Sequence, residues 1–198
     1  MSKGELLQFP GVVPEGQQVV FATLEALLFA AGEPVSVRAL GDAAGLEDLG
    51  EIRDVLRRLQ QQYEHPGRGL RLVEVAGGWQ LQTAPGVGES VAKLRGTRPK
   101  KLSPAAQETL SVIAYRQPVT KGEVDKLRGV DSGGVLRGLL ERQLIRVSGR
   151  RRDIPGRPLE YSTSKGFLEL FSLKSLADLP TLAEREELLT SGEQPDEE

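Results

Sequence analysis

Apolar and polar positions follow the same order twice along the chain, and the first cycle opens with three helical patterns. Residues 18–31 place apolar side chains three and four positions apart, which predicts a helix with a core face. Ser36 is a suitable N-cap for a short second helix that reaches Ala44. A third helix is expected to begin near Glu47 and to end before His65-Pro66-Gly67, a turn sequence.

Two alternating segments follow these helices. Residues 70–76 and 79–83 predict a β-hairpin, and Gly77-Gly78 is its expected turn because both positions can take positive φ. Trp79 alternates with polar neighbours and is expected to be a core anchor. Three helices followed by a hairpin make a winged helix, a variant of the helix-turn-helix.

The second half repeats the plan with clear capping signals. Ser103 precedes Pro104, as is typical of a helix start, and Thr120 and Glu123 have the spacing of a capping box. Asp131 or Ser132 is expected to cap the third helix of this half.

Two strands and a closing helix complete the second cycle. Residues 145–147 and 159–163 alternate as strands, with a wing of residues 148–158 between them, and residues 167–171 predict the helix. The predicted fold class is therefore α+β, mainly helical, with two tandem winged-helix domains. The expected parts are an irregular tail (1–17), the first winged-helix domain (18–95), a linker (96–102), the second winged-helix domain (103–180) and an acidic, disordered tail (181–198).

Composition narrows the chemistry that the chain can perform. The 198 residues include no cysteine and a single histidine, His65, which lies in a turn sequence. We find no catalytic constellation, no metal-ligand spacing and no phosphate-binding glycine loop, and therefore expect no enzyme activity, cofactor or metal. No stretch reads as a signal peptide or a membrane span, so the expected location is cytoplasmic.

The first helix is apolar on more than one side, which is typical of a helix that is buried twice. One interpretation is a dimer face that includes Phe21, Leu28 and Phe29. The other interpretation is a central core helix of a single domain.

DNA readers of this fold insert the start of the third helix into the major groove, where basic residues meet phosphates. The first domain instead places acidic residues there: Glu47, Asp48, Glu51 and Asp54. The corresponding helix of the second domain carries Gly133, Gly134 and Gly138, which leave few side chains to read bases. Specific duplex recognition by either helix is therefore not expected.

The second wing is basic. Its arginines are Arg150, Arg151, Arg152 and Arg157. They are candidates for contact with DNA phosphates or with acidic residues of a partner protein, and a solvated loop is the third interpretation.

The second half also resembles the segregation and condensation protein B family. The residues that carry the resemblance are Ala114-Tyr-Arg-Gln-Pro-Val-Thr120, Arg128-Gly-Val130, Gly134-Val-Leu-Arg-Gly-Leu-Leu-Glu-Arg142, Pro155-Gly-Arg-Pro158 with Tyr161, Thr163 and Phe167-Leu168, and Lys174-Ser-Leu-Ala-Asp-Leu-Pro180. Looser features of the first half, such as Glu25-Ala-Leu-Leu-Phe-Ala30 and Glu33-Pro34, agree with it.

This resemblance implies a homodimer joined through the first domains, with the second domain as the candidate for binding the kleisin subunit, segregation and condensation protein A. Through the kleisin it implies an SMC ATPase and a nucleoid-associated condensin-like complex in chromosome segregation and cell division. DNA would be bound only indirectly or weakly. The alternative function is a winged-helix DNA-binding protein, either a transcription regulator or a non-specific architectural protein that uses the Arg150–Arg157 wing.

Overall fold

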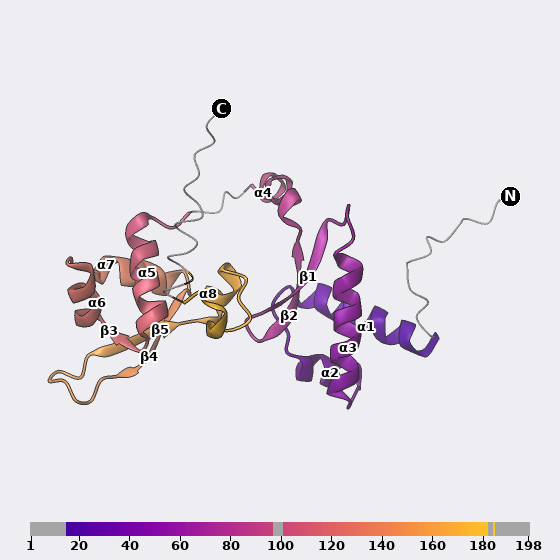
Figure 1. Cartoon of the computed structure of the whole chain (residues 1–198), viewed down its shortest axis with the longest axis horizontal. Helices are drawn as coiled ribbons and strands as arrows, with labels where there is room; N and C mark the ends of the chain where they lie inside the picture. The colour runs from indigo at the N-terminus through magenta and orange to yellow at the C-terminus, as the bar shows by residue number, and fades with distance from the viewer. Residues whose placement is uncertain (1–14, 97–100, 182–183, 185–198) are drawn as a thin grey trace. The chain divides into compact units, whose positions relative to one another are not determined.

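The chain forms two compact units, Met1–Lys101 and Leu102–Glu198 (Figure 1). The computed structural model describes residues 15–96, 101–181 and 184, so the expectations for most of both tails and of the linker lie outside the described residues. Each unit has its own hydrophobic core and the helix, helix, helix, hairpin order of a winged helix. The predicted fold class, α+β and mainly helical, is confirmed.

The elements of the first unit are α1 (Glu15–Ala31), α2 (Val37–Ala44), α3 (Leu49–Tyr63), β1 (Leu70–Val75), β2 (Gly78–Thr83), the 3₁₀ turn η1 (Pro85–Val87) and α4 (Gly88–Arg95). The Ser36 side chain accepts a hydrogen bond from the Ala39 amide, which confirms the predicted cap of α2. Helix α1 begins at Glu15, three residues earlier than the pattern indicated.

The hairpin turn lies one residue earlier than predicted. Val75 pairs with Gly78, so the two turn residues are Ala76 and Gly77, and both have positive φ (51° and 74°). Gly78 is not a turn residue but lies against the backbone of another segment. A Cβ at Gly78 would lie 2.8–2.9 Å from backbone atoms of Val35, which bridges to Trp79 through two backbone hydrogen bonds of 2.8 and 3.0 Å. Glycine is therefore required here by the close approach of two backbones and not by a turn.

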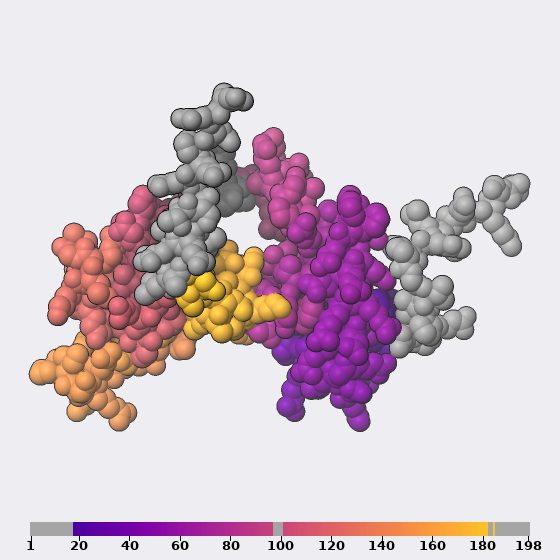
Figure 2. All heavy atoms as spheres, viewed as in Figure 1, coloured from indigo at the N-terminus to yellow at the C-terminus, as the bar shows by residue number. Residues whose placement is uncertain are grey.

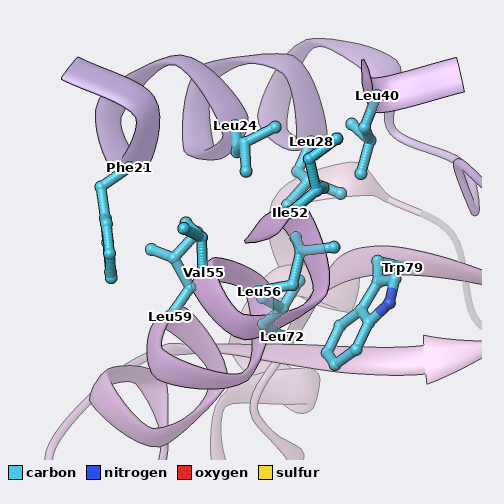
Figure 3. Close-up of a cluster of buried hydrophobic side chains, with 10 residues drawn as sticks. All are labelled: Phe21, Leu24, Leu28, Leu40, Ile52, Val55, Leu56, Leu59, Leu72 and Trp79. Atoms are coloured by element: carbon cyan, nitrogen blue, oxygen red, sulfur yellow. The ribbon is translucent and has the colours of Figure 1, made fainter. Parts of the chain in front are cut away.

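The core of the first unit lies between α1, α3 and the hairpin (Figure 3). Leu24 and Leu28 of α1 point toward Ile52, and Trp79 closes the core from β2. Trp79 is 5% exposed, which confirms its prediction as a core anchor.

The elements of the second unit are α5 (Pro104–Arg116), β3 (Val119–Thr120), α6 (Lys121–Arg128), α7 (Gly133–Glu141), β4 (Ile145–Arg150), β5 (Leu159–Thr163), α8 (Lys165–Leu170) and the 3₁₀ turn η2 (Leu176–Asp178). Ser103 caps α5 through the Ala106 amide, and Thr120 and Glu123 form the predicted capping box. These capping predictions are confirmed.

The three strands of this unit form an antiparallel sheet in the order β3-β5-β4. Strand β4 continues to Arg150, three residues beyond the predicted end, after an irregularity in register between Val147 and Gly149. The wing loop is therefore shorter than predicted and runs from Arg151 to Pro158. Figure 2 shows this wing (orange) as a projection from the second unit.

Candidate functional site

One side of α1 carries an apolar stripe that no described part of its own unit covers. Phe29 is 76% exposed and Val19 is 68% exposed. Exposed alanines continue the same face at helical spacing, and we call the set the α1 stripe: Val19, Ala22, Ala26, Phe29 and Ala30. At 1.5 Å per residue the stripe runs for about 16 Å along the helix.

The three residues of the predicted dimer face do not lie in the same environment. Phe21 (7% exposed) and Leu28 (1%) belong to the core of the first unit, so they are not available to a partner. Phe29 lies about a quarter turn around the helix from these residues and is available. The core interpretation is confirmed for Phe21 and Leu28, and the dimer face stays a prediction for Phe29.

The predicted dimer face did not include the alanines of the α1 stripe. Counting back from Phe29 in steps of three and four gives Ala26 and Ala22, and this spacing was the signal that could have found them. Small residues such as alanine decide how closely a second helix can approach.

Glu25 connects α1 to α3 beside the stripe. The Tyr63 hydroxyl donates a hydrogen bond to the Glu25 carboxylate, and Arg68 lies over the Tyr63 ring at 5.8 Å. Burial, together with the Glu25 carboxylate, raises the pKa of Tyr63 to about 12. The hydroxyl therefore remains a donor to Glu25 up to a higher pH than an ordinary tyrosine would.

The start of α3 is acidic, as the sequence predicted, and its first acid is already engaged. The Asp48 carboxylate accepts hydrogen bonds from the Gly50 amide at 2.7 Å and from the Glu51 amide at 3.1 Å. The helix dipole and the free amides that bind phosphate at many helix starts are thus taken by a carboxylate of the chain itself.

The start of α7 is held by a network of charges. Lys121 donates to both Asp125 (2.6 Å) and Asp131, and Asp125 accepts from the Ser132 amide and hydroxyl. Hydrogen bonds to the two aspartates raise the pKa of Lys121 to about 12, and hydrogen bonds from Lys121 and Ser132 lower the pKa of Asp125 to about 2. The turn between α6 and α7 is therefore closed by internal ion pairs.

The predicted cap of α7 was partly wrong. Ser132 occupies the N-cap position, but its hydroxyl donates to Asp125 and makes no bond to the first amides of the helix. Asp131 instead pairs with Lys121. Gly134 and Gly138 have open space where a Cβ would be, so α7 shows a bare surface to solvent.

The four predicted wing arginines do not share one environment. The Arg151 guanidinium bonds to Glu160 at 2.5 Å, to Glu123 at 3.3 Å and to the Pro118 carbonyl at 3.2 Å. The Glu160 carboxylate is the main cause of the raised pKa of Arg151. Arg151 thus holds the base of the wing, whereas Arg150, Arg152 and Arg157 are exposed.

Chemistry at a metal centre finds no support among the described residues. In that part of the chain, no three His, Cys, Asp or Glu side chains gather in a way that could hold a metal ion. No helix there combines the length and apolar character that crossing a bilayer requires. The surface features described above are the α1 stripe, the starts of α3 and α7, and the wing.

A family model and a sequence relative both match this chain to segregation and condensation protein B. Residues 22–182 match the family described as segregation and condensation complex subunit ScpB. The chain is 51% identical to segregation and condensation protein B of Syntrophotalea carbinolica over 172 residues, which cover 87% of this chain and 86% of that protein.

A second relative and a solved structure match different shares of the chain. Segregation and condensation protein B of Myxococcus xanthus is 46% identical over 166 residues, which cover 83% of this chain and 50% of that protein. A crystal structure of a dimer of an ScpB N-terminal domain complexed with a ScpA peptide is 31% identical and covers 40% of this chain and 98% of that chain, with a TM-score of 0.38.

Proposed function

The chain belongs to the family of segregation and condensation complex subunit ScpB, and from this premise we propose that it is a non-catalytic, dimeric scaffold subunit in chromosome segregation and condensation. The first unit forms the homodimer. The second unit binds the kleisin, segregation and condensation protein A, and reaches the SMC ATPase through it. The assembly is cytoplasmic and associated with the nucleoid, and this chain meets DNA only indirectly or weakly.

The α1 stripe is the observation that carries the proposal. An exposed phenylalanine near the C-terminal end of a run of exposed alanines offers apolar surface that water does not favour, and alanines let a second helix approach closely. A twofold interface uses the same patch on both subunits, so every apolar side chain of the stripe is buried twice in each dimer.

The acidic start of α3 and the bare surface of α7 support a protein-binding role for the remaining surfaces. Carboxylates repel phosphates, and glycines provide no donors or acceptors for base edges. The same features do not hinder contact with another polypeptide. The proposal therefore favours protein docking over operator recognition.

The variant Phe29→Glu tests the dimer. We expect it to weaken self-association by about 100-fold or more, because each dimer would bury two carboxylates without partners. Sedimentation velocity over a range of protein concentrations measures the change. Leu94→Glu is the matched control, since Leu94 is also apolar and is 88% exposed, but lies on α4. A dimer that Phe29→Glu leaves intact would remove the α1 stripe from the interface.

Binding of the purified kleisin of the same organism tests the scaffold role. We expect a stable complex in size-exclusion chromatography with light scattering, with or without DNA. Duplex binding by this chain alone should be weak and insensitive to sequence. A preference of about 10³-fold for one operator over random duplex, with no binding of the kleisin, would contradict the proposal and favour a transcription regulator.

A further inference from the structure

The wing of the second unit presents positive charge that the described structure leaves unneutralised. Residues 146–160 contain five arginines against Asp153 and Glu160, a net charge of 5 − 2 = +3. Glu160 is engaged by Arg151. Within the described residues, no carboxylate forms an ion pair with the exposed arginines, which are Arg146, Arg150, Arg152 and Arg157.

The backbone holds these arginines in a fixed arrangement. The Arg151 amide donates to the Pro158 carbonyl at 2.9 Å, and the Arg157 amide donates to the Ile154 carbonyl at 3.1 Å. Arg157 has a positive φ of 44°, and Arg150 donates from its side chain to the Arg157 carbonyl at 3.2 Å. Because the loop is closed by these bonds, binding would order mainly the arginine side chains and little of the backbone.

Pro180, which precedes the C-terminal segment, contacts α5 of the same unit. The Tyr115 hydroxyl donates to the Pro180 carbonyl at 2.7 Å. Three residues further along the chain, the Pro118 carbonyl accepts from Arg151 at 3.2 Å. Because neighbouring Cα atoms are at most 3.8 Å apart, the backbones of Tyr115 and Pro118 lie within about 11 Å of each other.

The segment that follows has the opposite charge and sufficient length. Residues 185–198 contain six acidic residues and one arginine, a net charge of 1 − 6 = −5. Glu184 is excluded from this sum because its carboxylate bonds to the amide and hydroxyl of Thr181. Fourteen residues extend for up to about 46 Å.

We propose that residues 185–198 dock against the exposed arginines of the wing in the same chain and shield them from other polyanions. Covalent linkage supplies the acidic segment at an effective concentration in the millimolar range. A duplex has no such advantage, because it is not covalently linked to the chain. The acidic segment is therefore the favoured occupant, and nucleic acid is a competitor that must displace it.

Paramagnetic relaxation enhancement tests the contact directly in the full chain. The absence of native cysteine allows one nitroxide label at Ser191→Cys. We expect the amide signals of residues 152–157 to lose intensity at low salt. The loss should disappear at about 0.5 M NaCl, where the Debye length falls to roughly 4 Å, and in the double variant Arg150→Gln/Arg152→Gln.

Two controls separate the outcomes. Arg38→Gln/Arg53→Gln removes two exposed arginines from the first unit and should leave the intensity loss unchanged. A mixture of labelled, isotope-free chain with unlabelled, isotope-enriched chain should show no loss at the wing. Full intensity at residues 152–157 in the labelled chain, a loss that survives the wing substitutions, or an equal loss in the mixture would each overturn the proposal.

Discussion

Replacing Gly78 with alanine is expected to lower the free energy of unfolding of the first unit by about 2–4 kcal/mol. The new Cβ would lie within 2.9 Å of three backbone atoms of Val35. The bridge between Val35 and Trp79 must therefore open, and its two hydrogen bonds would lengthen or break. The gain of about 0.4–1 kcal/mol from restricting the unfolded chain offsets only part of this loss.

The fluorescence of Trp79 measures this effect selectively. Trp79 is the only tryptophan of the chain and lies in the core of the first unit, so its urea transition reports the unfolding of that unit. Gly69→Ala is the matched control, because a Cβ at Gly69 meets nothing within 4 Å. Equal transition midpoints for the Gly78 and Gly69 variants would show that the Val35 backbone yields without cost.

The same bridge links the fold of the first unit to its proposed function. Beside it, the Gln80 side chain donates to the Gly32 carbonyl at 2.9 Å, directly after the end of α1. The hairpin thus fixes the end of the helix that carries the α1 stripe. A Gly78 variant that folds is expected to dimerise less well for this reason, without any change in the stripe itself.

The helix caps could be predicted from the sequence because each one depends only on residues that are close together in the chain. The caps at Ser36, Ser103 and Thr120 each depend on a side chain and an amide three residues away, so spacing alone identified them. The predicted position of the hairpin turn was wrong by one residue. The glycines allow the two-residue turn at Gly77-Gly78 as well as at Ala76-Gly77, so the local pattern does not select the register. A contact with Val35, more than 40 residues away, decides between them.

The surfaces were harder to predict for a related reason. Periodicity shows that α1 is apolar around most of its circumference, but it does not show which side faces α3. Phe21 and Leu28 are buried and Phe29 is exposed because packing against α3 and the hairpin selects one face. In the same way, four wing arginines look equivalent in the sequence until Glu160 and Glu123 engage Arg151.

Arg128 is the second residue whose replacement is expected to have a large effect, although it has no part in the wing. Its guanidinium donates to the Ala105 carbonyl at 2.7 Å and to the Thr109 hydroxyl at 2.8 Å, and so clamps α6 to α5. The Arg128 side chain is only 13% exposed and Thr109 is 1% exposed. The ion pair with Glu108 at 3.0 Å adds little, because Glu108 is mostly in solvent.

We expect Arg128→Met to destabilise the second unit by about 2–3 kcal/mol, since it leaves a buried hydroxyl without its donor. Circular dichroism should show an earlier transition of the second unit, while the Trp79 fluorescence transition stays in place. The double variant Arg128→Met/Thr109→Val should recover about 1 kcal/mol, because it removes the unpaired hydroxyl as well. Arg116→Met, on the exposed end of α5, should change stability by no more than about 0.5 kcal/mol. If Arg128→Met costs no more than Arg116→Met, then apolar packing alone joins α6 to α5, and the clamp adds nothing to the stability of the unit.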